Sequence, residues 1–179
     1  MAQEMYFLRV QIIFYEDKNF SGRHFECCDD CADLLSNLSC CSSIRVDSGC
    51  FMVYEKPNYT GNQYYLRTGE YPDLHQWIDS VSSCRHICTD PGSFNMRLYE
   101  RIEFGGQMMD LMEDCPSVVD LFHRTDIFSC NVMNGSWLFY EHPNYHGRMY
   151  LVRPGEYKRF SEWGGRSARV GSIRRITEN

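Results

Sequence analysis

One short phrase recurs four times along the 179-residue chain and constrains the fold more than any other feature. Each copy reads Tyr-Glu-x-x-x-aromatic-x-Gly, and successive tyrosines are 39, 45 and 41 residues apart. A fixed period of this length marks a repeated supersecondary unit. We therefore expect four copies of one folded motif, at residues 15–22, 54–61, 99–106 and 140–147.

The residues around each copy predict strands rather than helices. Four short segments are rich in aromatic and β-branched residues, and turn residues follow each of them. They are 11–15, 51–54, 95–99 and 137–140. The glycine suits a tight hairpin because it tolerates positive φ. The two aromatic rings of a copy can pack edge to face across the turn, and a later serine could bond the hairpin backbone. The pattern predicts an all-β sandwich or barrel.

The two halves of the chain resemble each other, which predicts two domains. Asn-Tyr-x-Gly and Gly-Glu-Tyr precede Trp77 in one half and Trp163 in the other. Turn-forming residues between the halves indicate a linker. We expect an extension that is flexible (1–10), a first domain (11–88, repeats 11–49 and 50–88), a linker (89–94) and a second domain (95–179, repeats 95–135 and 136–177).

With these motifs, the sequence resembles the βγ-crystallins, and specifically the vertebrate lens γ-crystallins. The family motif is Tyr/Phe-x4-Tyr/Phe-x-Gly followed by a serine. The matching positions are Tyr15, Phe20, Gly22 and Ser43; Tyr54, Tyr59, Gly61 and Ser80; Tyr99, Phe104, Gly106 and Ser129; and Tyr140, Tyr145, Gly147 and Ser172. The resemblance implies two all-β domains, each a β-sandwich of two intercalated Greek-key motifs.

The resemblance also implies a core and a domain interface. By position, the core side chains are Phe51, Trp77, Trp137 and Trp163. An apolar interface between the domains would use Met52, Tyr65 and Ile87 against Leu138, Leu151 and Ile176, with Gln63 and Met149 beside it. It further implies a monomer that contacts itself and other crystallins weakly at high concentration.

The chain departs from the usual γ pattern in three places. Phe51 stands where the family has a fourth tryptophan, the stretch from Trp77 to Ser80 is about two residues short, and the leader before Gln11 is long. The leader resembles the S-type. The nine methionines and the missing tryptophan resemble the M-type of aquatic vertebrates.

Composition and the N-terminal sequence argue against several classes of protein. A net charge of −6 argues against nucleic-acid binding, and apolar runs of only a few residues argue against a membrane span. The first residues show no signal-peptide pattern. We therefore expect a cytoplasmic protein, in lens fibre cells on the resemblance, whose ten cysteines are mostly thiols.

Calcium binding is the first alternative. Microbial relatives bind it through Asn/Asp-Asn/Asp-x-Ser/Thr-Ser, whose oxygens suit a hard cation. The windows 39–43, 76–80, 125–129 and 168–172 lack the acidic pair, and Arg169 would repel a cation. We expect no metal or cofactor, and a non-lens calcium- or metal-binding βγ module remains the alternative function.

Thiols and histidines offer two weaker metal candidates. Cys27, Cys28 and Cys31 lie close in sequence to Cys40, Cys41 and Cys50, yet the second pair of a zinc ribbon is missing. The acidic neighbours Asp29, Asp30 and Asp33 should raise the thiol pKa. His142 and His146 flank a turn without a third ligand.

No nucleophile elbow, zincin, P-loop or dinucleotide motif occurs, so we expect no enzyme. Instead, 26 aromatic residues, nine methionines and an excess of arginine (15 of 18 cations) make the chain rich in polarizable groups. The expected function is that of a dense, long-lived, refractive structural protein of the eye lens.

Overall fold

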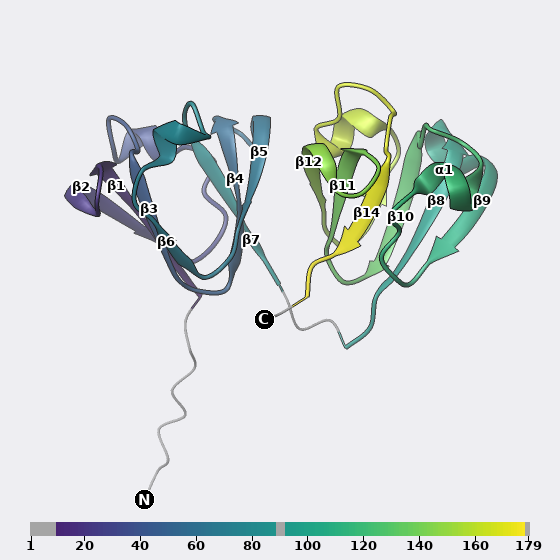
Figure 1. Cartoon of the computed structure of the whole chain (residues 1–179), viewed down its shortest axis with the longest axis horizontal. Coiled ribbons are helices and arrows are strands. Elements are labelled where there is room, and N and C mark those ends of the chain that lie inside the picture. The colour runs from purple at the N-terminus through teal and green to yellow at the C-terminus, as the bar shows by residue number, and fades with distance from the viewer. Residues whose placement is uncertain (1–9, 89–91, 178–179) are drawn as a thin grey trace, which may run out of the picture. The chain divides into compact units, whose positions relative to one another are not determined.

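The computed structural model describes residues 10–88 and 92–177. The chain divides into two compact units with the main boundary between His86 and Ile87, and antiparallel strands make up most of each unit (Figure 1). The expected flexible extension, apart from Val10, and residues 89–91 of the expected linker lie outside the described residues. Among the helices of the described ranges, none is long and apolar enough to cross a bilayer.

The N-terminal unit contains two sheets, with strand orders β2-β1-β3-β6 and β5-β4-β7. Its helical segments are the single turns η1 (Leu34–Ser36) and η2 (Leu74–Gln76). Its strands are β1 (Gln11–Asp17), β2 (Ser21–Cys27), β3 (Ser43–Ser48), β4 (Cys50–Lys56), β5 (Thr60–Leu66), β6 (Gly69–Tyr71) and β7 (Ser83–Ile87).

The C-terminal unit repeats this plan, with strand orders β13-β10-β8-β9 and β12-β11-β14. Its helical segments are η3 (Ile102–Phe104), α1 (Val118–Phe122) and η4 (Phe160–Trp163). Its strands are β8 (Asn95–Arg101), β9 (Gly105–Leu111), β10 (Ser129–Asn134), β11 (Trp137–His142), β12 (His146–Val152), β13 (Gly155–Tyr157) and β14 (Ser172–Arg175).

The two repeats of each unit exchange strands. β6 belongs to the second repeat but pairs with β3 of the first, and Cys31 of the first repeat bridges Cys84 on β7 of the second. In the C-terminal unit β13 pairs with β10 in the same way, and Cys115 bridges Ile173. These crossings make each unit a β-sandwich of two intercalated Greek keys, which confirms the predicted fold class.

Aromatic rings fill the C-terminal core. Trp137 and Phe139 on β11 are completely buried, and Trp163 of η4 meets Phe139 in a T-shaped contact with ring centroids 5.2 Å apart. Phe94, expected in the linker, instead packs edge-on against Trp137 at 5.5 Å. The C-terminal unit therefore begins to pack before its first strand.

Phe51 on β4 is completely buried in the N-terminal unit, in a tilted contact with the ring of His86 at 5.6 Å. Trp77 is not part of that core, and its assignment there was wrong. Trp77 is 44% exposed, while Leu74 and Ile78 on either side of it are buried.

A shortened loop explains the position of Trp77. Six positions separate Trp77 from Ser83 at the start of β7, whereas nine separate Trp163 from Ser172 at the start of β14. Residues 74–85 instead match 34–45 of the first repeat, with the same order of buried, intermediate and exposed positions. In that register Trp77 takes the exposed place of Asn37. The shorter loop lacks the residues that carry Trp163 inward.

Candidate functional site: the four hairpin corners

Each repeat folds its first hairpin into a corner, defined here as the Tyr-to-Gly segment together with the serine that bonds it. Two successive residues adopt left-handed φ at the turn, and the glycine follows two positions later. The pairs are Asn19 and Phe20, Asn58 and Tyr59, Glu103 and Phe104, and Asn144 and Tyr145, with φ between 55° and 61°.

Gly22 shows why the corner requires glycine. Its φ is +80°, and a Cβ there would lie 2.4 Å from Oδ2 of Asp17. Gly147, with φ +85°, would place a Cβ 2.6 Å from Cδ2 of His142. Side chains at these positions would meet both backbone strain and a steric clash.

An edge-to-face pair of rings closes every corner. The first tyrosine of each repeat meets the aromatic residue five positions later, and all four contacts are T-shaped. The centroid distances are 5.8 Å for Tyr15–Phe20, 5.7 Å for Tyr54–Tyr59, 5.4 Å for Tyr99–Phe104 and 5.7 Å for Tyr140–Tyr145.

A buried serine ties each corner to the following strand. Ser43 Oγ donates to the carbonyl of Asp17 at 2.6 Å and accepts from the amide of Phe20 at 3.0 Å. Ser129 and Ser172 make the same two bonds in the third and fourth repeats. Each hydroxyl thereby satisfies two backbone groups of the turn.

In the second repeat Ser83, not Ser80, makes these bonds, so the assignment of Ser80 was wrong. Ser83 Oγ donates to the carbonyl of Lys56 at 2.7 Å and accepts from the amide of Tyr59 at 3.0 Å, and Ser83 is fully buried. Ser80 is exposed and donates to the carbonyl of Glu55. The register of the first repeat, Ser43 before Arg45 and Ser83 before Arg85, was the signal that identifies the correct serine.

Sequence reasoning also missed an arginine over three of the corners. The guanidinium carbons lie 4.3 Å (Arg45 over Phe20), 4.1 Å (Arg85 over Tyr59) and 3.9 Å (Arg174 over Tyr145) from the ring centroids. Each arginine is two residues beyond the serine, on the same face of the strand. The third repeat has Asn131 there. The third corner also has Glu103 where the others have asparagine.

The corner serines cannot serve as nucleophiles, because each is fully buried and bonded on both sides. Ser42 Oγ does lie 3.0 Å from Nε2 of His75. The nearby carboxylate of Asp73 accepts from the backbone amide of His75 and pairs with Lys18 at 3.4 Å. Asp73 therefore binds the backbone of His75 and Lys18, in contrast to the carboxylate of a catalytic triad, which binds the imidazole ring.

The windows considered for calcium offer few ligands. Asp126 lies within 125–129 and Glu100 lies nearby; Glu100 pairs with Arg124 at 3.0 Å and accepts from the amide of Gln107. That amide bond, with Arg124, lowers the pKa of Glu100. Across residues 10–88 and 92–177, no three His, Cys, Asp or Glu side chains gather to hold a metal ion.

The structure rearranges the expected thiol cluster. Cys27 and Cys31 lie with Cys84, which sequence reasoning missed because strand exchange between repeats brings it there. A hydrogen bond from the Cys84 thiol lowers the pKa of Cys27 and outweighs the charge of Asp29, which raises it as expected. The same bond raises the pKa of Cys84, and burial together with Asp33 raises the pKa of Cys31. Of the other members, Cys28 and Cys40 are exposed, and Cys41 and Cys50 are buried.

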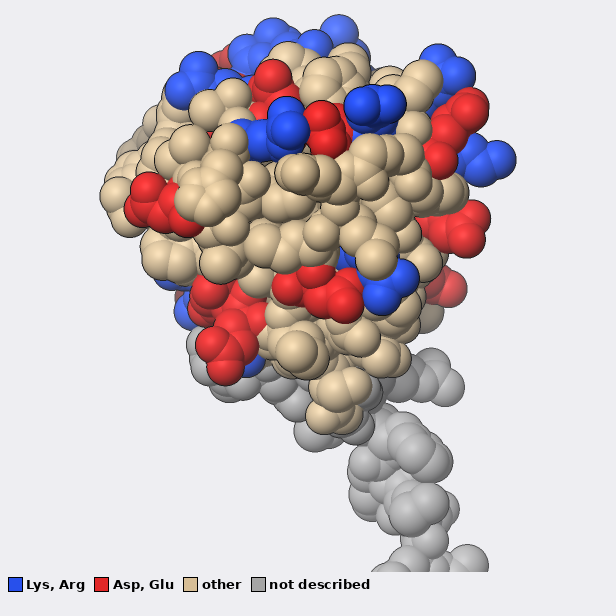
Figure 2. Space-filling model, turned by 90° about the vertical axis from the view of Figure 1, so that its right-hand side faces the viewer, with Lys and Arg blue, Asp and Glu red and all other residues tan. Residues whose placement is uncertain are grey.

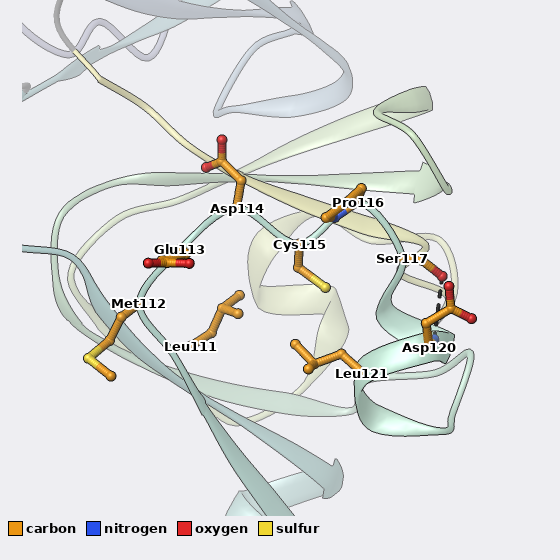
Figure 3. Close-up of a pocket in the computed structure, with 9 residues that line it drawn as sticks. All are labelled: Leu111, Met112, Glu113, Asp114, Cys115, Pro116, Ser117, Asp120 and Leu121. Carbon is orange, nitrogen blue, oxygen red and sulfur yellow. Dashed lines mark hydrogen bonds between the residues drawn. The ribbon is translucent and has the colours of Figure 1, made fainter.

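A shallow depression lies beside α1, with a volume of about 470 Å³ (Figure 3). Its apolar lining includes Leu111, Met112 and Leu121. Asp114 on its rim is bonded to Arg175, and the Ser117 hydroxyl accepts from the amide of Asp120. These polar groups are committed to the fold rather than directed at a substrate.

The face in Figure 2 carries basic and acidic groups interspersed among other residues. In the C-terminal unit several pair directly, as in Arg97 with Asp110 at 2.7 Å and Arg124 with Glu100 at 3.0 Å. No broad basic surface of the kind that binds nucleic acid appears in this view.

The residues predicted for the domain interface group by unit. Met52, Gln63, Tyr65 and Ile87 lie on β4, β5 and β7, which form one three-stranded sheet. Leu138, Met149, Leu151 and Ile176 lie on or just after β11, β12 and β14, the corresponding C-terminal sheet. Their pairing stays a prediction.

Comparison with known proteins agrees with this architecture. The Beta/Gamma crystallin family model matches residues 11–87 and 95–176. Gamma-crystallin S-1 and M2 of Chiloscyllium indicum are 60% and 58% identical, each over 94% of this chain and over 99% and 98% of their own lengths. Human Gamma-crystallin B is 54% identical over 94% of this chain and 98% of its own length. The chain is therefore a member of the Beta/Gamma crystallin family.

Proposed function

We propose that the protein is a structural, non-enzymatic constituent of the eye lens, packed densely in the cytoplasm of fibre cells. The observation that carries this proposal is the 54–60% identity, over nearly the whole chain, to relatives named gamma-crystallins. Its partners would be other crystallins and further copies of itself in weak contacts, with the chain itself a monomer, without nucleic-acid or membrane partners.

The placement of polarizable side chains supports an optical role. Arginine stacks on an aromatic ring at three of the four corners, and paired rings close all four. Aromatic, guanidinium and thioether groups are more polarizable than aliphatic or ammonium groups. Close packing of these groups raises the refractive index for a given mass of protein.

The surface suits a protein that stays dissolved at high concentration. Mixed charges give a modest repulsion. Among the exposed apolar side chains, Leu35, Ile102 and Met108 lie apart from the depression beside α1, which Met112 and Leu121 line. Small apolar patches limit association. Such a surface suits weak contacts rather than a fixed oligomer.

Quantitative mass spectrometry of dissected eye tissues tests the proposal. The protein should be a bulk component of the lens fibre extract and scarce in other tissues. A trace level in lens, with higher abundance elsewhere, would contradict it. Micromolar calcium binding by calorimetry would favour the non-lens calcium- or metal-binding module instead.

A further inference from the structure

The only Asn-Gly pair in the sequence, Asn134 and Gly135, connects the two sheets of the C-terminal unit between β10 and β11. Asn134 is exposed, whereas Gly135 is buried with a φ of +78°. A Cβ at Gly135 would lie 2.4 Å from Cδ1 of Phe94, so the fold requires glycine there. With no Cβ on Gly135, the side chain of Asn134 has an unhindered path to the following backbone nitrogen.

The regular ladder of β10 ends at Asn134. Its pairing with β8 shifts register between Val132 and Asn134, and Asn134 lies opposite Asn95, the first residue of β8. Strand ends open more readily than strand centres. The backbone at Asn134 therefore has the freedom that closure of a ring onto Gly135 requires.

The same backbone is joined directly to the core. Nε1 of Trp137 donates to the carbonyl of Asn134 at 3.2 Å, and Trp137 is completely buried. On the other side of Gly135, the carbonyl of Ser136 accepts from the amide of Ile176 at 2.9 Å. The short segment between the sheets is thus held at both ends, and a change in its length acts on the core.

We propose that Asn134 is a site of deamidation through a succinimide, and that the isoaspartate product disturbs the packing of Trp137. The backbone nitrogen of Gly135 attacks Cγ of Asn134, and a C–N bond forms. The bond from Cγ to the side-chain nitrogen breaks, and that nitrogen leaves as ammonia with the proton given up by Gly135. Water then opens the ring at either carbonyl, which gives aspartate or isoaspartate.

The products differ in their effect on the core. Aspartate keeps the original backbone and adds a negative charge at an exposed position. Isoaspartate routes the main chain through Cβ and Cγ, so the segment becomes longer and the former backbone carbonyl becomes a free carboxylate. That carbonyl is the acceptor for the indole of Trp137. The inference rests on this geometry and is independent of the proposed lens function.

The first experiment ages the full chain in warm, mildly alkaline buffer and follows each asparagine by peptide mass spectrometry. Asn134 should deamidate several-fold faster than Asn58 and Asn144, which are also exposed but precede tyrosine. Enzymatic methylation of isoaspartyl groups should label the peptide that contains position 134. Equal rates at the three asparagines, or no isoaspartate at position 134, would overturn the proposal.

The matched variant Asn134→Gln keeps a side-chain amide but must close a larger and less favourable ring. It should accumulate far less product at this position than the parent does during the same ageing. A rate equal to that of Asn134 in the parent would argue against a succinimide.

A second experiment tests the effect on the core. The isoaspartate fraction of the aged protein, separated by chromatography, should exchange the indole hydrogen of Trp137 faster by NMR and unfold at a lower urea concentration than the parent. Freshly purified Asn134→Asp carries the charge on an unaltered backbone and should match the parent in both measurements. An isoaspartate fraction that matches the parent, or an equal loss in fresh Asn134→Asp, would contradict the backbone effect.

Discussion

The guanidinium carbon of Arg174 lies 3.9 Å from the ring centroid of Tyr145, directly over the fourth hairpin corner. Arg45 and Arg85 cover the first and second corners in the same way, and their buried Nε atoms have no hydrogen-bond partner in the structure. Stacking, rather than hydrogen bonding through Nε, is therefore what these two arginines contribute at the corner.

Replacing the stacked arginine should destabilise the C-terminal unit. Arg174→Met keeps an apolar stem but loses the cation over Tyr145, so we expect a loss of about 0.5–2 kcal/mol in the free energy of unfolding. Chemical denaturation measures it. Arg148→Met, at an exposed position on β12, removes the same charge and is the matched control. Equal losses for the two variants would contradict a specific role for stacking.

A substitution at the third corner should make the C-terminal unit more stable. Glu103 has φ 55°, a conformation that asparagine tolerates better than glutamate, and the other three corners have asparagine there. Glu103→Asn should stabilise the C-terminal unit by roughly 0.5–1 kcal/mol, since the exposed pair of Glu103 with Arg159 at 3.4 Å contributes little. Asn144→Glu is the reciprocal test and should destabilise. A thermal scan showing no gain for Glu103→Asn would refute the argument.

The two candidate serines of the second repeat should behave very differently. Ser83→Ala leaves the Lys56 carbonyl and the Tyr59 amide without their buried partner, so it should cost about 1–3 kcal/mol. Ser80→Ala removes one exposed hydrogen bond and should stay within about 0.5 kcal/mol of the parent. Urea titrations of both variants decide between them, and the reverse ranking would restore Ser80 as the corner serine.

Acid should weaken the β8–β9 hairpin through Asp110. Hydrogen bonds from Arg97, at 2.7 and 3.3 Å, hold the pKa of Asp110 below its usual value. The contribution is therefore present above the unfolded carboxyl pKa and is lost as the pH falls through the lower folded value. Asp110→Asn should flatten the acid limb of unfolding free energy against pH, while Glu113→Gln should not. Parallel curves for Asp110→Asn and the parent would argue against this linkage.

The repeat predicts the fold well because each copy contains the residues that its own hairpin requires. Tyr, aromatic, Gly and Ser recur at spacings that one hairpin can satisfy, so the all-β Greek-key architecture follows from local chemistry. The wrong predictions concern residues whose burial and hydrogen bonds depend on the length of a neighbouring loop. Trp77 matches Trp163 through the motifs that precede both, but the loop after Trp77 is shorter and follows the register of the first repeat, so neither Trp77 nor Ser80 has the predicted role.

Long-range contacts explain what sequence reasoning missed. Cys84 joins Cys31 only because the repeats exchange strands, which no local spacing reveals. The arginine stacks over three of the four corners depend on strand pairing, which places Arg45, Arg85 and Arg174 against rings far away in the sequence. Phe94 belongs to the C-terminal core and not to the linker, because its ring contacts that of Trp137.

Differential refractometry of the purified protein tests the central claim most directly, which is that the polarizable composition serves an optical role. With 26 aromatic residues, nine methionines and arginine as 15 of the 18 cations, the refractive increment per gram should exceed that of ordinary globular proteins measured in the same buffer and at the same wavelength. An increment equal to or below that of those proteins would contradict the account.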